Sequence, residues 1–308
     1  MRKLTINKND SGQRLDKFLT KYLDNIPQSM LYKGLRKNCV RVNGKHVKDG
    51  KYFLQDGDEL TLYFSDEFFS RNDVFTAGNS DINIVYEDDN IILINKEQGI
   101  VVHSDDKGTS DTLLSRMQSY LYKKGEYSPN TEHSFAPAFC NRLDRNTSGI
   151  IIGAKNAEAL RIINEKIKLR EIKKLYLCIV DGIPEKSGYL EAYLIRGEKK
   201  VSVTDTETNN SKNIKTRYSL IAQKHDTALV EVEIETGRTH QIRAQMAHIG
   251  HPLHGDKKYG SKYSCHMSLA SYKLKFDFQT DAGILNYLNG REFQITVDFS
   301  EIFSSAKS

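Results

Sequence analysis

The feature that most restricts the fold of this chain is a series of short strand-like runs between residues 81 and 234. Some runs are continuously apolar, as in GIIIGA (149–154), and others alternate, as in ALVEVEI (228–234). In the last run valines and glutamates point to opposite sides, so one face of the predicted sheet is solvated. The predicted strands are INIVY, IILIN, GIIIGA, LYLCIV, YLEAYL, TRYSLIA and ALVEVEI.

Two segments in this part of the chain have helical spacing instead. The first follows Asn156, a possible cap, and its apolar stripe consists of Leu160, Ile163 and Ile167. The second is predicted to begin at Thr239 as its N-cap and to end at Gly250. Many strands with few helices indicate an α+β fold with a long mixed or antiparallel sheet, which we assign to residues 81–303.

Residues 1–64 differ from the rest in charge. They carry 13 Lys and Arg against 7 Asp and Glu, a larger excess than the +5 of the whole chain. Helical spacing in RLDKFLTKYL and the turn residues Asn43-Gly44 between alternating residues predict a small α+β domain. Its clustered cations are Lys33, Arg36, Lys37, Arg41, Lys45 and Lys48. A solvated charged surface is one interpretation, but no acidic residue interrupts the cluster, which favours contact with RNA phosphates.

Several other features limit the class of protein. Residues 65–80 are rich in Ser, Asn, Asp and Gly, without periodicity, and are interpreted as a linker. No apolar run approaches the ~20 residues of a membrane helix, and the N-terminus has no secretory pattern. The cysteines are far apart in the sequence: Cys39, Cys140, Cys178 and Cys265. We therefore expect a cytoplasmic protein with reduced thiols that does not contact membranes, and a monomer.

The segment NRLDRNTSG, residues 141–149, places a carboxylate between two arginines. Asp144 is flanked by Arg142 and Arg145 in a stretch of turn-forming residues that leads directly into the apolar run GIIIGA. Most aspartates in such loops only stabilise a turn or cap a helix. The functional interpretation is a carboxylate in a basic pocket that also attracts phosphate.

A second segment, TGRTHQIR at residues 236–243, places His240 and Arg243 on one face at the positive end of a predicted helix. The guanidinium group of Arg243 is suited to hold a carboxylate with two hydrogen bonds, although a surface position is the simpler interpretation. Four histidines follow one another from here: His240, His248, His251 and His254. Gly250 and a proline break the helix that would align them, so we expect no metal site.

Together these segments resemble the RluA-type pseudouridine synthases. The similarity rests on NRLDRNTSG, with YEDDNIILINKEQGIVVHS before it and KKLYLCIVDG, ETGRTHQIR and HIGHPLHGDKKYG after it. All five segments occur in the order found in that family. Residues 1–64 resemble the small S-four RNA-binding domain that is often fused to these enzymes. The resemblance implies a pseudouridine-synthase catalytic fold and the isomerisation of uridine in RNA, without cofactor or metal.

The resemblance also implies roles for individual residues. Asp144 corresponds to the essential carboxylate, Arg243 to its partner, and Tyr176 to the aromatic side chain that packs against the target uracil. Tyr176 is otherwise an ordinary core tyrosine on a strand. The resemblance implies that Arg142 positions the RNA, and we add Arg145 and His240 as further RNA contacts. Whether the carboxylate acts as nucleophile or base stays open.

Three positions depart from the family pattern: Asn141 replaces the usual histidine, Glu97-Gln98 replaces a proline-containing step, and Ala270 replaces a histidine. Our leading hypothesis is a synthase that acts on large-subunit ribosomal RNA, free or in a precursor particle. One alternative is an RNA-binding protein without catalysis. Another is a nucleoside hydrolase, which would need two carboxylates about 5–9 Å apart. Asp256 is the only partner of Asp144 that the sequence offers for that chemistry.

Overall fold

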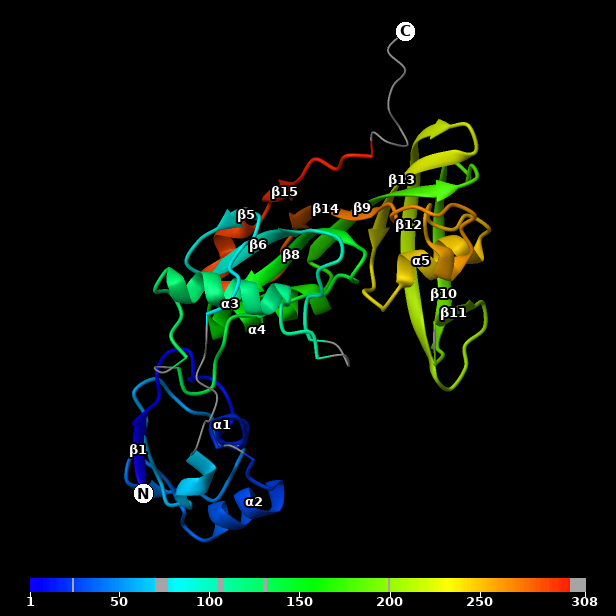
Figure 1. Ribbon diagram of the computed structural model, residues 1–308. Helices are drawn as coiled ribbons and strands as arrows, with labels where there is room; N and C mark the ends of the chain where they lie inside the picture. Colours follow the sequence, from blue (N-terminus) through cyan, green and yellow to red (C-terminus); the bar gives the residue numbers. More distant parts are fainter. Residues whose placement is uncertain (24, 70–76, 105–107, 130–131, 199, 300–308) are drawn as a thin grey trace. The chain divides into compact units, whose positions relative to one another are not determined.

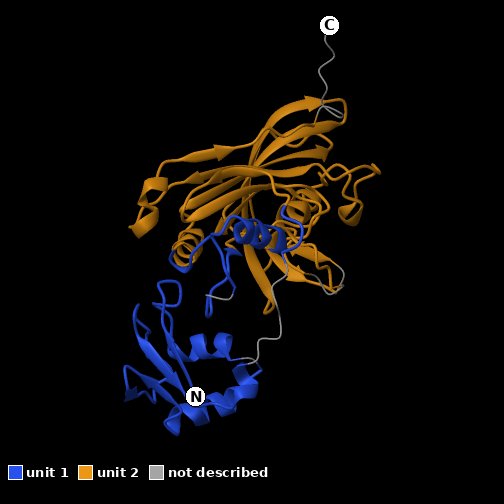
Figure 2. Ribbon diagram, turned by 60° about the vertical axis from the view of Figure 1, so that its left-hand side comes forward, with its two compact units in different colours: residues 1–80, 115–138, 155–158 blue, residues 81–114, 139–154, 159–308 orange. Residues whose placement is uncertain are grey.

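The computed structural model describes residues 1–23, 25–69, 77–104, 108–129, 132–198 and 200–299 (Figure 1). The chain divides into two compact units (Figure 2): the first unit comprises residues 1–80, 115–138 and 155–158, and the second unit the remainder. The predicted RNA-binding domain, 1–64, falls within the first unit. Residues 70–76 of the predicted linker and 300–303 of the predicted catalytic domain lie outside the described residues.

Residues 1–64 of the first unit form a four-stranded sheet and two α-helices. The strand order is β1-β4-β2-β3, with bounds Arg2–Thr5, Glu59–Leu62, Val40–Val42 and Lys45–His46. Helices α1 (Leu15–Tyr22) and α2 (Gln28–Arg36) share an apolar core with these strands. Asn43 and Gly44 both have positive φ, 50° and 76°, as a two-residue hairpin turn requires. The predicted hairpin is therefore confirmed. A short 3-10 helix, Asp66–Phe69, follows.

The second unit is built on an 11-stranded sheet, and all seven predicted strands are part of it. The strand order is β11-β10-β12-β13-β9-β14-β8-β6-β5; β15 pairs with β14 and β7 with β8. The bounds are β5 Ile84–Glu87, β6 Ile91–Lys96, β7 Ala138–Phe139, β8 Ser148–Ala154, β9 Ile172–Asp181, β10 Ser187–Arg196, β11 Val201–Thr204, β12 Ser211–Lys224, β13 Thr227–Ile234, β14 Leu269–Phe276 and β15 Glu292–Gln294. Along that order only β14 and β8 run parallel, which confirms the mixed sheet.

Helices cover parts of this sheet. Helix α4 (Ala157–Lys168) packs its predicted apolar stripe, centred on Ile163, against β6, β8 and β14. Helix α5 (Gln241–His248) lies beside β10 and β12 (Figure 1). The sequence analysis did not predict α3 (Leu113–Lys123), most of which belongs to the first unit, or the 3-10 helices Lys257–Tyr259 and Gly283–Leu288. No helix in the described part of the chain has the length and apolarity to cross a bilayer.

The N-terminus of α5 differs from the prediction. The N-cap position belongs to His240 rather than Thr239, and no side chain caps the helix there. His240 has a left-handed backbone, with φ 55° and ψ 20°. Histidine is one of the residues that tolerate this conformation, and here its ring is held by Tyr259. The predicted end of the helix is confirmed, since Gly250 has φ 87° just beyond it.

The parallel pairing of β8 with β14 requires a glycine. Gly149 pairs with Ser271, has φ 112°, and a Cβ there would collide with the Ser271 backbone. Any other residue would therefore separate the two strands. Because Gly149 directly follows the NRLDRNTS segment, this close approach fixes where the loop carrying Asp144 leaves the sheet.

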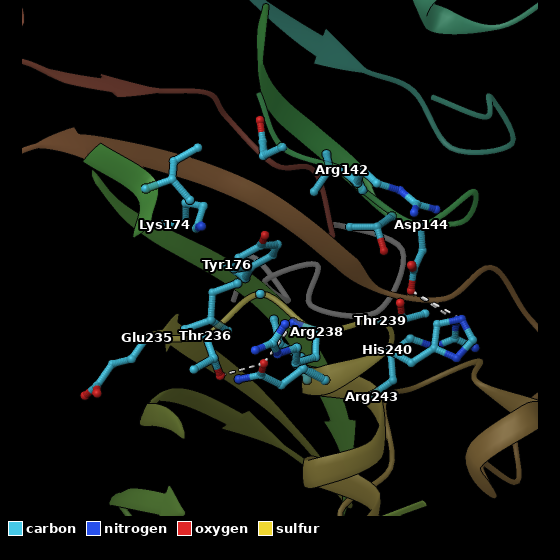
Figure 3. Close-up of a pocket in the computed structure, with 18 of the residues that line it drawn as sticks. Arg142, Asp144, Lys174, Tyr176, Glu235, Thr236, Arg238, Thr239, His240 and Arg243 are labelled. Atoms are coloured by element: carbon cyan, nitrogen blue, oxygen red, sulfur yellow. Dashed lines mark hydrogen bonds and ion pairs between the residues drawn. The ribbon is translucent and has the colours of Figure 1, made fainter. Parts of the chain in front are cut away.

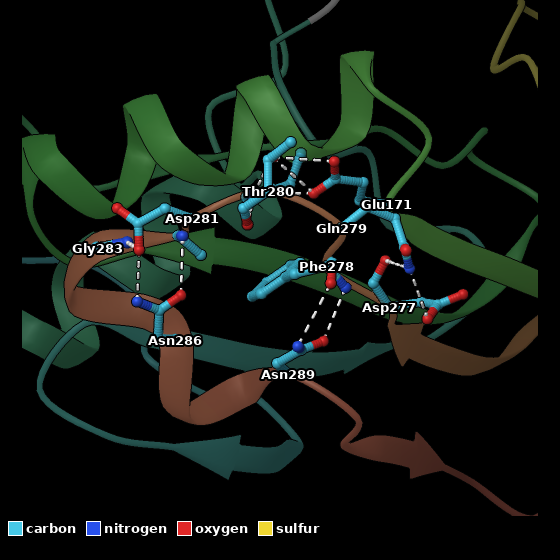
Figure 4. A network of polar contacts seen from close by, with 11 residues as sticks. Glu171, Asp277, Phe278, Gln279, Thr280, Asp281, Gly283, Asn286 and Asn289 are labelled. Atoms are coloured by element: carbon cyan, nitrogen blue, oxygen red, sulfur yellow. Dashed lines mark hydrogen bonds and ion pairs between the residues drawn. The ribbon is translucent and has the colours of Figure 1, made fainter.

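A polar network anchors the start of β9 (Figure 4). The buried Lys166 ammonium donates to Glu171 Oε2 at 2.8 Å and to the Thr280 carbonyl at 2.6 Å. Further along, Asn289 bonds the backbone of Phe278 in both directions, at 2.8 and 3.3 Å. The segment 277–289 is thereby tied to the end of α4 and to the residue that precedes β9.

Candidate active site

Five of the six sequence-predicted site residues of the second unit meet at one cavity of about 600 Å³ (Figure 3). Its walls come from the loop 140–147, from β9, and from the segment that joins β13 to α5. The predicted residues that line it are Arg142, Asp144, Tyr176, His240 and Arg243. Arg145 is exposed and does not line the cavity.

The loop that carries Asp144 is held from inside the protein. The Asp144 carbonyl accepts a hydrogen bond from Thr147 N at 3.0 Å, which closes a turn, and Leu143 is buried. Beneath it lies Lys96, at the end of β6, with no solvent exposure. Its ammonium donates to the carbonyls of Glu97, Ile100 and Arg145 at 2.8, 2.9 and 3.0 Å.

Lys96 is a site residue whose role the sequence analysis missed. Burial lowers its pKa to about 8, although the charge of Asp144 opposes that shift. A lysine at the end of an apolar strand gives no local sign that it will be buried. Through its hydrogen bonds to three carbonyl groups, Lys96 stabilises the loop that carries Asp144.

Asp144 faces the cationic end of Arg243. The distance from Arg243 Nη1 to Asp144 Oδ2 is 3.4 Å, and the Asp144 side chain is 26% exposed, so it remains open to the cavity. Arg243 itself is only 10% exposed. Its two other nitrogens, Nε and Nη2, bond Asp256 at 2.6 and 2.9 Å. Burial alone would lower the pKa of Arg243, but the hydrogen bond and charge of Asp256 raise it above its ordinary value.

Asp256 therefore fixes the guanidinium that faces Asp144. The sequence predicts a two-bond carboxylate for Arg243, but that partner is Asp256, and Asp144 receives a single longer contact. Asp256 is 3% exposed and both its oxygens are bound. Its burial leaves this carboxylate little access to the water that the hydrolase hypothesis would need it to activate. Nearby, Asp181 bonds His254 and Ser261, each at 2.8 Å, which steadies the loop carrying Asp256.

His240 completes the surroundings of Asp144. Its Nε2 lies 3.5 Å from Asp144 Oδ2, and its Nδ1 lies 2.9 Å from the hydroxyl of Tyr259. Burial lowers the pKa of His240, opposed by the charge of Asp144 and reinforced by that of Arg243. The imidazole is therefore neutral at physiological pH. The Tyr259 ring also faces the guanidinium of Arg243, at 5.1 Å, and was not predicted as part of the site.

Two buried glutamines fix α5 on the sheet. Gln241 Nε2 donates to the Lys215 carbonyl and to Thr216, while its Oε1 accepts from Arg238 N at 3.1 Å. Gln245 Nε2 donates to the Leu190 carbonyl at 3.2 Å. These contacts to β12 and β10 set the position from which Arg243 reaches Asp144.

Tyr176 lies in the middle of the sheet, on β9. Its strand neighbours are Val232 of β13 and Ser271 of β14, and the side chain is 6% exposed. Burial raises the pKa of Tyr176 well above its ordinary value, so the hydroxyl is protonated at neutral pH. The cavity therefore has an uncharged aromatic side chain in its wall, near the Asp144 carboxylate.

Comparison with known proteins identifies the family to which this chain belongs. Residues 90–248 match the family described as RNA pseudouridylate synthase, and residues 13–60 match the S4 domain. The chain belongs to the RNA pseudouridylate synthase family. An uncharacterized RNA pseudouridine synthase of Mycoplasma capricolum is 31% identical over 299 residues, which cover 94% of this chain and 96% of that protein.

Other relatives and solved structures agree. The ribosomal large subunit pseudouridine synthase C of Escherichia coli is 32% identical over 271 residues, 84% of this chain and 80% of that protein. The structure of human RNA pseudouridylate synthase domain containing 4 matches with a TM-score of 0.57 at 18% identity, over 70% of this chain and 89% of that one. The predicted synthase fold is thus confirmed, and the protein is an RNA pseudouridine synthase that isomerises uridine in RNA.

The residues predicted to contact RNA differ in their exposure to solvent. In the S4 domain Lys33, Arg36 and Lys37 are exposed at the end of α2. Arg41 on β2 is half-buried, with its guanidinium 5.7 Å from the centre of the Tyr63 ring. In the second unit Arg142 is exposed where it lines the cavity.

The three histidines that follow His240 in the series from the sequence analysis bond Asp205 or Asp181. His248 bonds Asp205 at 3.1 Å, His251 the Asp181 carbonyl at 3.1 Å, and His254 the Asp181 carboxylate at 2.8 Å. Among the described residues no three His, Cys, Asp or Glu side chains are grouped so as to hold a metal ion.

Proposed function

We propose that this synthase isomerises specific uridines of large-subunit ribosomal RNA, with Asp144 as its essential carboxylate and without a cofactor. The substrate class is supported by relatives whose names specify the ribosomal large subunit. The observation that carries the role of Asp144 is its position: a partly open carboxylate in the cavity, beside the buried guanidinium of Arg243 at 3.4 Å. Here residues 1–64 bind RNA and residues 81–303 form the catalytic domain.

The reaction explains why these side chains belong together. The enzyme breaks the bond between ribose C1′ and uracil N1, turns the free base, and rejoins it through C5. Asp144 acts on the ribose as nucleophile or as base. Arg243 positions it, because Asp256 holds the guanidinium fixed from the other side. Tyr176 packs against the uracil so that the base stays in the cavity between the two bond changes.

RNA binding must also make the uridine accessible. Extruding a base from its stack costs a few kcal/mol, least in loops and loosened stems. Arg142, Arg145 and His240 contact the RNA around the extruded nucleotide, and the cations of α2 and β2 contact phosphates further away. The substrate is ribosomal RNA, free or within a precursor particle, and the enzyme acts on it as a monomer.

Release of tritium from uridine labelled at C5 tests this function, because forming the new C1′–C5 bond must expel that hydrogen. Ribosomal RNA from cells lacking the protein is incubated with the wild type and with Asp144→Asn. We expect release by the wild type and none by the variant, with RNA affinity nearly equal. Substantial release by Asp144→Asn would remove this carboxylate from the mechanism, and no release by the wild type would refute the proposed substrate.

A further inference from the structure

Among the described residues of the second unit three lysines are buried, and one of them has no partner among these residues. Lys96 donates to three carbonyls, and Lys166 to Glu171 and Thr280. Lys174 is 9% exposed, and no described residue offers its ammonium a hydrogen-bond acceptor or a carboxylate. Burying an unpaired cation is costly, and burial lowers the pKa of Lys174. Because Lys174 also lines the cavity, its ammonium is available to a ligand bound there.

The ammonium of Lys174 belongs to the catalytic cavity. Lys174 lines that cavity, and its Nζ lies next to Gly237, in the segment between β13 and α5. Glu235 lines the same cavity but pairs with Arg217 at 3.2 Å and Arg170 at 3.5 Å. This carboxylate of the cavity wall is therefore paired with two arginines rather than with Lys174.

The strand also shows where Lys174 lies relative to the base. Residues two apart on a strand share a face, so Lys174 and Tyr176 are neighbours on one side of β9, about 7 Å apart along the chain. Figure 3 draws Tyr176 between Lys174 and Asp144. A uracil packed against Tyr176 with its ribose at Asp144 thus turns its far edge toward Lys174.

We propose that Lys174 Nζ donates a hydrogen bond to a carbonyl oxygen of the target uracil and stabilises the negative charge that the base carries while it is detached from the ribose. This inference rests on the proposed function, in which Tyr176 packs against the base and Asp144 acts on the ribose. It gives the detached base a fixed cationic partner at the end of the cavity away from Asp144.

The chemistry of the reaction fits such a donor. When the C1′–N1 bond breaks, its electron pair stays with the uracil, and the negative charge spreads over N1, O2 and O4. When the C1′–C5 bond forms, C5 loses its proton and N1 gains one, so the product is an isomer of the substrate. Lys174 keeps its own proton throughout, and its charge acts more strongly because its side chain is largely removed from water.

The symmetry of uracil allows one donor to serve both halves of the reaction. A half-turn about the axis through N3 and C6 exchanges N1 with C5 and O2 with O4. A donor that bonds one carbonyl oxygen before the turn therefore bonds the other afterwards. Lys174 fits this role because its strand holds it in one place.

The adjacent lysine provides a matched control. Lys173 points to the other face of β9 and pairs with Asp277 at 2.8 Å, 42% exposed. At saturating RNA, we expect Lys174→Met to slow single-turnover tritium release roughly 10²–10³-fold, the usual cost of removing one donor from an anion site. Lys173→Met should match the wild type, and Lys174→Arg, which keeps the charge, should recover part of the rate.

Sulfur substitution in the substrate then identifies the contact. In the RNA segment around the modified uridine, 2-thiouridine or 4-thiouridine replaces the target, because sulfur accepts hydrogen bonds more weakly than oxygen. We expect each to slow the wild type roughly fivefold to tenfold, and neither to slow Lys174→Met further. Sulfur penalties of equal size in both proteins would overturn the inference.

Two other results would overturn it while leaving the proposed function intact. One is an unchanged rate in Lys174→Met. The other is a variant that binds RNA more weakly but reaches the wild-type rate at saturation, which would make Lys174 a phosphate contact. If the wild type itself releases no tritium, the proposed function fails, and the inference fails with it.

Discussion

The synthase places positive charge in two contrasting ways. At the end of α2 in the first unit, Lys33, Arg36 and Lys37 are exposed to solvent. In the cavity of the second unit, Arg243 and Lys174 are about nine-tenths buried. Exposed charges are screened within about 8–10 Å at physiological salt, so each adds a little affinity wherever a phosphate passes. Buried charges are screened much less and act on particular atoms. We therefore infer that the first region binds RNA and the second controls the chemistry.

The largest effect after loss of Asp144 itself should come from the buried pair that positions it. Arg243→Gln should lower the single-turnover rate roughly 10²–10³-fold. Asp256→Asn should lower it roughly tenfold to a hundredfold, because the guanidinium loses a charged partner. Tritium release at saturating RNA measures both. Asp205→Asn removes an exposed carboxylate that pairs with His248, and should have no effect. An Asp256→Asn rate equal to that of Asp205→Asn would show that Asp256 does not position Arg243.

The aromatic wall should contribute next, through RNA affinity. Tyr176→Leu removes the ring and should weaken binding of the target RNA by about 1–3 kcal/mol, the usual worth of stacking one base on an aromatic side chain. Tyr176→Phe keeps the ring and should bind as the wild type does. Titration of labelled RNA measures the dissociation constants. If Tyr176→Phe binds as weakly as Tyr176→Leu, the hydroxyl rather than the ring holds the base.

Burial of the Lys96 ammonium should make the free energy of unfolding depend on pH. Its pKa is lowered to about 8 in the folded protein, from 10.5, so between these values the unfolded chain binds more protons. Stability due to this group therefore rises with pH. Relative to Lys96→Met, the unfolding free energy of the wild type should rise by about 2 kcal/mol from pH 8 to 10. Urea titrations measure it. Replacing the exposed Lys33 by Met serves as the control, and parallel curves for wild type and Lys96→Met would contradict the account.

The exposed region should give the smallest effect and the strongest dependence on salt. The triple variant Lys33→Gln, Arg36→Gln, Lys37→Gln should weaken RNA binding roughly tenfold and reduce the slope of log affinity against log salt by about 2. The rate at saturating RNA should not change. A lower rate at saturation would mean that these residues contribute to the chemistry as well, and the contrast between the two regions would be lost.

What the sequence predicts well is local. The hairpin at Asn43-Gly44, the apolar strand 149–154 and the stripe of α4 depend on neighbouring residues, and the structure contains all three. The resemblance of five ordered segments was sufficient to predict the family. Short-range patterns and family motifs therefore account for most of the fold.

What the sequence does not predict depends on distant contacts or on backbone conformation. Asp256 meets Arg243 only because the loop after α5 folds back. Lys174 and Lys173 are adjacent and chemically identical, yet only the sheet decides which is buried. Thr239 is a better cap by residue type than His240, but the left-handed turn at His240 shifts the helix start by one residue. No local sequence pattern predicts these three features.

The central claim, that Asp144 of this chain makes pseudouridine in large-subunit ribosomal RNA, is tested most directly in cells. Pseudouridines are mapped in that RNA from a strain lacking the protein, complemented with nothing, with the wild type, or with Asp144→Asn. The account predicts that one or more sites disappear without the protein, return with the wild type, and stay absent with the variant although it still binds RNA. An identical map in all strains, or sites restored by Asp144→Asn, would contradict it.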